Sequence, residues 1–329
     1  MEDLRNERVL VTGASGFIGR ALVERLSKSR VDVAGLCRSA PRAENGAQHA
    51  AFMQVDLNEP EAVWASVETF KPTLCYHLAA HPDGAESHEQ SHAVLQTNVM
   101  GTLNLLEALR RAETSRVVYG CSVKVYGNGP VPYHPDQAVT PNSSYAVAKA
   151  AGREMIELYR RLYGMASVSL RPTLVFGPGQ GRNIFSFAAG RLAEGADDIP
   201  LMGGSQTRAP VFIDDAVDAF IAAGAQLEPG NALDGMAIPI SGAEELSIST
   251  LVQEMASVAG QRLTPVLIEN DTRPTEIFRC FADNSYAEAS LGWRPATSLR
   301  DGLRKTLVAA GVAVPALHTA GTEELVNAV

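Results

Sequence analysis

The chain has 329 residues, of which 46% are hydrophobic and 20% are charged, a composition typical of a globular protein with a substantial core. A net charge of −9 argues against broad binding to nucleic acid or to an anionic membrane. The chain has no apolar run near ~20 residues, a charged start without a secretion signal, and no C-x-x-C pair, so we expect a cytoplasmic protein that does not span a membrane.

The first half of the chain alternates between strand and helix patterns. Residues 8–12 predict a buried strand, residues 17–29 an amphipathic helix and residues 31–36 a second strand, which together form a βαβ unit. The alternation continues through residues 51–55, 74–80, 98–111, 116–120, 145–163 and 168–172. It predicts a doubly wound parallel sheet of the α/β class. Beyond residue 177, short elements and prolines such as Pro239 indicate a smaller, more irregular lobe.

A glycine turn connects the first strand to the first helix. Its spacing is G-x-x-G-x-x-G, which differs from the G-x-G-x-x-G of ordinary dehydrogenases. Such a turn points backbone N–H groups and the positive end of a helix at a pyrophosphate. We therefore expect a dinucleotide to bind along Gly13, Ser15, Gly16, Phe17, Ile18 and Gly19.

The end of the second strand bears on the choice of cofactor. An NAD site usually has an acidic residue there, but this chain has Arg38 and Ser39. A guanidinium and a hydroxyl suit a 2′-phosphate, so the sequence favours NADP(H), with NAD(H) still possible and a solvated Arg38 as the alternative interpretation. The ends of the next two strands add expected cofactor contacts at Asp56, Leu57, Leu78, Ala79 and Ala80.

Ten short segments occur in a characteristic order: residues 13–19, 77–80, 98–102, 122–127, 145–149, 171–172, 177–180, 208–215, 273–274 and 292–295. In order and spacing they resemble the extended short-chain dehydrogenase/reductases, specifically the nucleotide-sugar epimerases, dehydratases and ketoreductases. The resemblance covers nearly the whole chain and implies a Rossmann-type sheet with a smaller C-terminal α/β substrate lobe. It assigns residues 1–175 and about 211–232 to the dinucleotide-binding domain, and residues 176–210 and about 233–329 to the lobe.

The resemblance gives Ser122, Tyr145 and Lys149 catalytic roles. Tyr145 lies one helical turn before Lys149, whose ammonium, together with an oxidised nicotinamide, favours the phenolate. Tyr145 would exchange a proton with the sugar oxygen, Ser122 would hydrogen-bond that oxygen, and Lys149 would hold the nicotinamide ribose. By the same resemblance, Asn98 and Arg171 join the cofactor contacts.

The two positions after Ser122 distinguish members of the family. Dehydratases carry an Asp-Glu pair there, whereas this chain has Val123 and Lys124, so an elimination has no acid/base pair. Together with Arg38, this favours the NADPH-dependent reduction of an NDP-4-keto-6-deoxyhexose, with Tyr145 as proton donor. An NAD-dependent nucleotide-sugar 4-epimerase is the alternative. A non-catalytic NADP-binding regulator is a minor one, because such proteins tend to lack the tyrosine or the lysine.

The expected substrate contacts are His81, Lys124, Asn183, Arg208 and Arg273, of which the two arginines match the pyrophosphate-binding arginines of the family. Two positions depart from the family pattern, where Leu174 replaces an asparagine and Ala209 an aspartate.

Histidines at helical spacing, His77 with His81 and His88 with His92, could present two imidazoles to zinc, but no third ligand is apparent, so we expect no metal. The helices at residues 98–111 and 145–163 resemble those that pair in homodimeric relatives, so we expect a homodimer.

Overall fold

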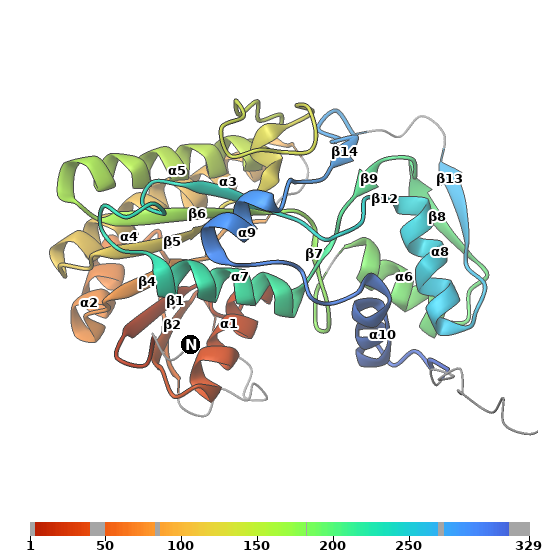
Figure 1. Ribbon diagram of the computed structural model, residues 1–329, viewed down its shortest axis with the longest axis horizontal. Helices are drawn as coiled ribbons and strands as arrows, with labels where there is room; N and C mark the ends of the chain where they lie inside the picture. Colours follow the sequence, from red (N-terminus) through yellow and green to blue (C-terminus); the bar gives the residue numbers. More distant parts are fainter. Residues whose placement is uncertain (1–3, 40–49, 83–85, 182, 269–272, 316–329) are drawn as a thin grey trace, which may run out of the picture.

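The computed structural model describes residues 4–39, 50–82, 86–181, 183–268 and 273–315. Its main feature is a seven-stranded parallel sheet in the order β11-β6-β5-β4-β1-β2-β3 (Figure 1). The strands are β1 (Arg8–Thr12), β2 (Asp32–Cys37), β3 (Ala51–Gln54), β4 (Leu74–His77), β5 (Arg116–Gly120), β6 (Ala166–Pro172) and β11 (Ala237–Ile240). This is the Rossmann-like α/β fold that the alternating pattern predicts.

Helices cover both faces of this sheet because successive strand side chains point in opposite directions. Val9 and Val11 of β1 belong to one core cluster, and Leu10 belongs to the other. The first face carries α1 (Phe17–Lys28) and α7 (Ile213–Gln226); the second carries α2 (Pro60–Phe70), α4 (Gly101–Arg111) and α5 (Ser144–Tyr163). Between α3 (His88–Leu95) and α4, a single π-helical turn, η2, covers Gln96–Met100.

A smaller lobe is built from residues beyond β7 (Val175–Phe176). It contains the parallel pair β8 (Asp198–Met202) and β13 (Thr264–Ile268), and a three-stranded sheet of β9 (Thr207–Arg208), β12 (Leu246–Ser247) and β14 (Arg279–Cys280). Its helices are α6 (Ile184–Ala193), α8 (Ile248–Ala259) and α10 (Leu299–Ala309). Strand β10 (Val211–Phe212) then leads into α7, and α9 (Ser285–Leu291) packs against α7 and β11.

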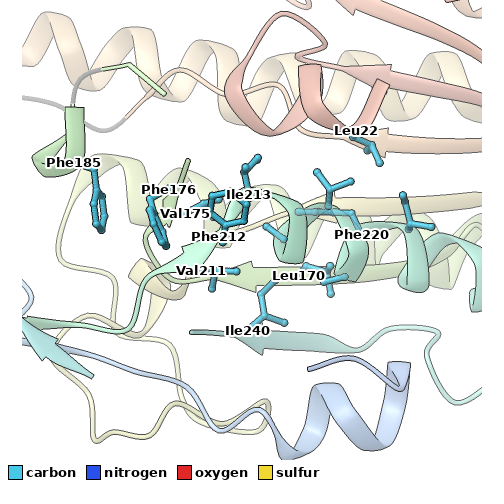
Figure 2. Close-up of a cluster of buried hydrophobic side chains, with 14 of the residues drawn as sticks. Leu22, Leu170, Val175, Phe176, Phe185, Val211, Phe212, Ile213, Phe220 and Ile240 are labelled. Atoms are coloured by element: carbon cyan, nitrogen blue, oxygen red, sulfur yellow. The ribbon is translucent and has the colours of Figure 1, made fainter. Parts of the chain in front are cut away.

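The lobe and the large sheet share a continuous apolar core (Figure 2). Phe176 of β7 stacks on Phe185 of α6, with ring centroids 4.5 Å apart, and meets Phe212 of β10 edge to face at 5.6 Å. The same cluster continues to Phe220 of α7 and Leu170 of β6. The side chains that join the two parts are therefore buried against one another.

Strand β11 corrects one of the expected boundaries. We expected the return to the large domain to end near residue 232, but residues 237–240 pair with β6 in the large sheet, with Pro239 opposite Arg171. A proline is tolerated here because β11 is an edge strand, so one side of its backbone has no ladder to maintain. The division of the chain into two domains otherwise remains a prediction.

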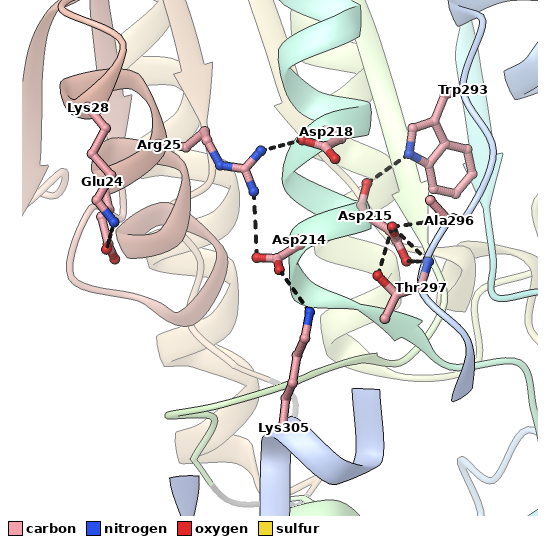
Figure 3. Close-up of polar contacts among 10 residues, drawn as sticks. All are labelled: Glu24, Arg25, Lys28, Asp214, Asp215, Asp218, Trp293, Ala296, Thr297 and Lys305. Atoms are coloured by element: carbon pink, nitrogen blue, oxygen red, sulfur yellow. Dashed lines mark hydrogen bonds and ion pairs between the residues drawn. The ribbon is translucent and has the colours of Figure 1, made fainter. Parts of the chain in front are cut away.

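A polar anchor joins α7 to the C-terminal part of the chain (Figure 3). The buried carboxylate of Asp215 accepts hydrogen bonds from the backbone N–H groups of Ala296 and Thr297, both at 3.1 Å, and from the Thr297 hydroxyl at 3.2 Å. Its backbone carbonyl accepts a hydrogen bond from the indole of Trp293 at 2.8 Å. Within the described part of the chain, no helix is long and apolar enough to cross a membrane.

Candidate active site

The carboxyl ends of the parallel strands place most of the expected site residues along one edge of the sheet. Gly13 follows β1, Ala79 follows β4, Ser122 follows β5 and Arg171 lies near the end of β6. Since β1, β4, β5 and β6 are neighbours, these residues are adjacent in space although they are far apart in sequence. This edge is where open α/β sheets bind their ligands.

The glycine turn leaves no room for side chains. Gly13 has φ +67°, and a Cβ there would lie 2.7 Å from the backbone nitrogen of Ala79. A Cβ on Gly19 would lie 2.2 Å from the Gly13 carbonyl oxygen. Helix α1 has Gly16 as its N-cap, no acidic residue in its first turn and, among the described residues, no side-chain cap. This cradle fits a pyrophosphate, with Ser15 exposed and Phe17 and Ile18 half-buried beside it.

The expected adenosine contacts are more open. Arg38 and Ser39 are exposed just after β2, and residues 37–39 contain no carboxylate. Asp56 follows β3, is half-buried and accepts a hydrogen bond from the Asn58 backbone at 2.9 Å, while Leu57 is buried. These residues lie on the same side of the glycine turn because β2 is the strand beside β1 and β3 is the strand beyond β2.

A histidine between two threonines fixes the end of β4. The hydroxyl of Thr12 lies 2.8 Å from His77 Nδ1, and that of Thr102 lies 2.8 Å from His77 Nε2. The Ala79 N–H donates to Thr12 Oγ1 at 3.1 Å, which holds the segment with Leu78 and Ala80 against the glycine turn. Burial, and to a lesser degree Lys149, lowers the pKa of His77 to about 3, so the ring is neutral. No cluster of possible metal ligands occurs in the described ranges.

Tyr145 and Lys149 lie on consecutive turns of α5, which begins at the Ser143 N-cap. Lys149 is 2% exposed, and its ammonium donates to the Gly120 carbonyl oxygen at 2.6 Å. It lies 4.8 Å from the centre of the Tyr119 ring. Burial lowers the pKa of Lys149 to about 8, so the group is still mostly charged at pH 7. Tyr145 is half-buried. Burial raises the pKa of the Tyr119 phenol, and the neighbouring Cys121 and Tyr145 add to this rise, so Tyr145 lies close to Tyr119.

Ser122 starts the short 3₁₀ helix η3 (Val123–Tyr126), which turns the chain away from the sheet. Its hydroxyl is half-buried and accepts a hydrogen bond from the Lys124 N–H at 3.2 Å. Since Gly120, the acceptor of Lys149, is two residues earlier, the expected catalytic residues Ser122, Tyr145 and Lys149 converge at the end of β5. The structure brings together these groups from β5 and α5.

Asn98, one of the expected cofactor contacts, is hydrogen-bonded to the backbone of His81. It is 1% exposed in η2, and its amide accepts from the His81 N–H at 2.6 Å and donates to the His81 carbonyl at 3.1 Å. Asn98 therefore holds the His81 backbone. The His81 ring itself is half-buried, with Nδ1 3.3 Å from Gln90 Nε2.

Arg171 is buried against an aromatic partner that the sequence did not reveal. Its Nη1 donates to the Tyr126 hydroxyl at 2.6 Å, and its guanidinium lies 4.8 Å from the Tyr126 ring centre. Its Nε has no hydrogen-bond partner among the described residues. No carboxylate within the described ranges forms an ion pair with it. The Arg171 guanidinium is therefore a buried positive charge beside η3.

Arg208 and Arg273 of the lobe both contact Glu276. Arg208 forms a 2.6 Å ion pair with Glu276 and donates to the carbonyls of Thr207 and Ile277, both at 2.8 Å. Arg273 is exposed, and its carbonyl accepts from the Glu276 N–H at 2.9 Å. A ligand diphosphate would therefore have to compete with Glu276 for Arg208.

Asn183 and the two departures from the family pattern have structural explanations. Asn183 caps α6 in a reciprocal pair with Ser186, while its Nδ2 is buried and has no partner among the described residues. Leu174 packs against the shared apolar core. Ala209 is fully buried, and its N–H donates to the Cys280 carbonyl at 3.0 Å.

Known proteins resemble this chain over most of its length. The model of the NAD dependent epimerase/dehydratase family matches residues 9–234. A UDP-glucose 4-epimerase of Mycolicibacterium smegmatis is 36% identical over 319 residues, covering 91% of this chain and 97% of the relative. A UDP-glucuronate 4-epimerase of Thermodesulfobacterium geofontis is 28% identical, covering 91% and 94%.

Solved structures also resemble this chain over most of its length. The UDP-glucuronic acid 4-epimerase of Bacillus cereus, in complex with UDP-glucuronic acid and NAD, superimposes with a TM-score of 0.83 at 27% identity, covering 92% of this chain and 98% of that one. The UDP-glucose 4-epimerase of Thermus thermophilus in complex with NAD gives a TM-score of 0.81 at 29% identity, covering 93% and 100%.

Proposed function

This chain belongs to the NAD dependent epimerase/dehydratase family, and on that premise we propose that it is a nucleotide-sugar 4-epimerase. The observation that carries the proposal is the convergence of Ser122, Tyr145 and Lys149 at the end of β5, in a chain whose relatives named above are 4-epimerases. The reductase that we preferred from the sequence becomes the second candidate, since none of those relatives is named a reductase.

We assign the cofactor site to NAD, which is bound in the Bacillus cereus and Thermus thermophilus structures. The glycine turn and the start of α1 would hold its pyrophosphate, and Leu78 to Ala80 would lie beside it. When bound, the nicotinamide supplies a reversible acceptor for hydride at the sugar carbon. Lys149 would bind the adjacent ribose from its buried position.

The side chains of this chain would handle the proton and the developing charge. Tyr145 takes the proton from the C4 hydroxyl as the carbonyl forms and returns it when the carbonyl is reduced from the other face. Ser122 donates a hydrogen bond to the same oxygen in its carbonyl form. The Lys149 ammonium favours the phenolate of Tyr145. Because Val123 and Lys124 supply no carboxylic acid pair, the site does not support dehydration at C5 and C6.

The diphosphate of the substrate would lie against Arg208 and Arg273. Guanidinium groups donate paired hydrogen bonds that match diphosphate oxygens. Arg208 lies in β9 of the lobe, and its ion-pair partner Glu276 donates its N–H to the Arg273 carbonyl. This arrangement would place the sugar between the arginines and Tyr145.

The test is the cofactor content and activity of the purified protein. An epimerase of this kind retains its cofactor, so the extracted nucleotide should be NAD, and the protein should interconvert C4 epimers of a UDP-sugar without added reductant. A protein that needs stoichiometric NADPH and releases a reduced sugar would contradict the proposal.

Arg38 and Ser39 specifically favour the second candidate, an NADPH-dependent 4-ketoreductase. For that reaction, wild-type protein should bind NADPH at least about 10-fold more tightly than NADH, and Arg38→Asp should reverse the preference. If Arg38→Asp leaves the ratio of the NADPH and NADH affinities unchanged, Arg38 is a solvated residue that does not select the cofactor. That result would support the epimerase over the reductase.

We also propose a homodimer, formed through α3 and α5 in place of the expected pair of helices at residues 98–111 and 145–163. Several large apolar side chains on these packed helices are exposed: Leu95, Val147, Leu158 and Leu162. Contiguous exposed apolar side chains are typical of subunit interfaces. Analytical ultracentrifugation should give the mass of a dimer, and a Leu158→Glu, Leu162→Glu double variant should give that of a monomer. A monomeric wild type at micromolar concentration would contradict this part of the proposal.

A further inference from the structure

The turn that carries Ser122 is fastened to β6 at both of its ends. Before the turn, the Cys121 N–H donates to the Leu170 carbonyl at 2.8 Å, which extends the pairing of β5 with β6. After it, the Tyr126 hydroxyl accepts a hydrogen bond from Arg171 Nη1 at 2.6 Å. Consecutive residues of one strand therefore hold the two ends of η3. The first attachment uses backbone atoms alone, whereas the second depends on two side chains.

The guanidinium of Arg171 is a costly group to place at this position. Arg171 is 4% exposed, its Nε has no hydrogen-bond partner among the described residues, and no carboxylate in the described part of the chain forms an ion pair with it. A buried cation without a counter-ion is destabilising, and a well-packed apolar side chain would fold more favourably. Fold stability alone therefore does not account for Arg171, whose guanidinium lies 4.8 Å from the centre of the Tyr126 ring.

Tyr126 connects this guanidinium to the turn. It is the last residue of η3 and is fully buried, and burial raises the pKa of its phenol, so the hydroxyl stays protonated at neutral pH. The hydroxyl can therefore accept from Arg171 and at the same time donate to the His134 carbonyl, 2.8 Å away. Its ring stacks on that of Tyr133, with centroids 4.8 Å apart. Tyr126 is thus held by a cation, a carbonyl and an aromatic ring.

Ser122 lies at the other end of the same short helix. Its hydroxyl accepts a hydrogen bond from the Lys124 N–H at 3.2 Å, and its carbonyl accepts one from the Val125 N–H at 3.3 Å. The orientation of the Ser122 hydroxyl is therefore set by the first turn of a helix that has four residues. Because a displacement of about 1 Å can cost a reaction about 10²-fold in rate, a shift of Tyr126 at the far end of η3 should reach the chemistry.

Resting on the proposed epimerase function, we propose that Arg171 is a positioning residue. Through Tyr126 it holds η3 so that the Ser122 hydroxyl meets the C4 oxygen of the sugar. In this role Arg171 touches neither the sugar nor the nicotinamide, which differs from the cofactor contact that the resemblance implies. Losing the hydrogen bond between Arg171 and Tyr126 should lower kcat, and it should have no further effect once the Ser122 hydroxyl is absent.

The first experiment is a double-mutant cycle of Tyr126→Phe and Ser122→Ala on the NAD-loaded protein. With the UDP-sugar that wild type interconverts, Tyr126→Phe should lower kcat about 10-fold and leave KM and the affinity for NAD within about 2-fold. In the Ser122→Ala background the same substitution should change kcat less than about 2-fold. Tyr76→Phe is the matched control and should behave as wild type, because Tyr76 is also fully buried and its hydroxyl has no partner among the described residues.

Hydrogen–deuterium exchange tests the same contact without turnover. The amides of residues 123–127 should exchange at least about 10-fold faster in Tyr126→Phe and in Arg171→Met than in wild type, while those of β5 should not change. Arg171→Lys keeps a cationic donor, so its exchange rate and its kcat should lie between those of wild type and Arg171→Met.

The possible outcomes separate this inference from the proposed function. Unchanged exchange at residues 123–127, or additive losses of kcat in the cycle, would overturn the role of Arg171 and leave the epimerase proposal standing. So would an Arg171→Lys variant that binds NAD more than about 10-fold more weakly at unchanged kcat, because Arg171 would then contact the cofactor. Faster exchange confined to this segment, in a protein that interconverts no UDP-sugar, would support the hold on η3 and overturn the epimerase. If Tyr126→Phe does not fold, the same cycle and exchange measurements with Arg171→Lys decide.

Discussion

The sheet edge that we propose as catalytic and the side of the lobe that we propose as the substrate site hold their polar side chains in different ways. At the sheet edge, Lys149 is almost fully buried and its ammonium is fixed on a strand-end carbonyl. On the lobe side, Arg208 is bound to Glu276, and the oxygen of Asn183 caps a helix. At the sheet edge the ammonium is buried and fixed, whereas on the lobe side the arginine and the asparagine already have partners within the protein.

This difference separates two kinds of energetic cost. Preorganised groups need no rearrangement at the moment of reaction, which is the usual origin of strong catalytic effects. Groups with internal partners must exchange them for the ligand, so part of the binding energy is lost. Changes at the sheet edge should therefore affect turnover, whereas changes in the lobe should affect affinity by smaller factors.

The largest effect should come from Tyr145→Phe. Removing the hydroxyl removes the proton acceptor, and kcat should fall about 10³-fold because positioned acid–base groups contribute 10²–10⁴-fold. The affinities for NAD and substrate should change less than about 3-fold. Tyr163→Phe, at the exposed end of the same helix, is the control. Near-normal turnover in Tyr145→Phe would remove this residue from the mechanism.

Lys149→Met should separate activity from stability. We expect kcat to fall by about 100-fold or more, because the cation that favours the Tyr145 phenolate is lost. The folded-state pKa of about 8 lies below the ordinary lysine value of 10.5, so the unfolded chain binds more protons between those pH values. Stability from this group is therefore lowest below pH 8 and rises as pH increases towards 10.5.

The corresponding measurement is denaturant unfolding of wild type and Lys149→Met from pH 7 to 10. At pH 7 the variant should unfold with a free energy about 1–3 kcal/mol higher, and this gain should shrink as pH rises. A variant that is less stable than wild type at pH 7 would show that the Gly120 hydrogen bond outweighs the burial of charge.

Asp215→Ala tests the anchor between α7 and residues 293–297. Truncation removes the acceptor of the Ala296 and Thr297 N–H groups, a carboxylate that is itself 3% exposed, so we expect a loss of about 2–4 kcal/mol in the free energy of unfolding. Asp214→Ala, one residue away, removes only longer ion pairs to Arg25 and Lys305 and should cost less than about 0.5 kcal/mol. The measurement is urea unfolding of both variants. If Asp214→Ala and Asp215→Ala lose the same free energy of unfolding, the Asp215 hydrogen bonds do not act as a specific anchor.

The smallest effect should come from Arg208→Gln. Because Arg208 would have to exchange Glu276 for the proposed diphosphate, its net contribution is reduced, and KM should rise about 5- to 10-fold with kcat within about 3-fold of wild type. Steady-state kinetics with a UDP-sugar would measure both. A loss of kcat as large as that of Tyr145→Phe would erase the contrast between the two sides of the site.

Local patterns were sufficient for much of the fold. The alternation of apolar strands and amphipathic helices predicted the parallel sheet, because both faces of such a sheet are buried and each strand is a short apolar run. Strand β11 was missed because Pro239 resembles a strand breaker, and its place beside β6 is a long-range pairing that periodicity does not encode.

The candidate site shows the same division. The glycine turn is predictable because its constraint is local, and the structure shows which backbone atoms a side chain would strike. The partners Thr102, Tyr119, Tyr126 and Glu276 were not predicted because their contacts join residues far apart in sequence. The expected reduction rested largely on Arg38, an exposed side chain whose type alone does not determine the cofactor.

The hydrogen bonds of Asp215 also have a consequence for the order in which this protein is completed. Their donors are up to 82 positions further along the chain, and translation at 5–20 residues per second delivers them about 4 to 16 s after the aspartate itself. During that interval a nascent polypeptide carries α7 with a carboxylate that has yet to meet its donors. Final closure of this junction on the ribosome therefore waits until the Trp293–Thr297 segment has left the exit tunnel.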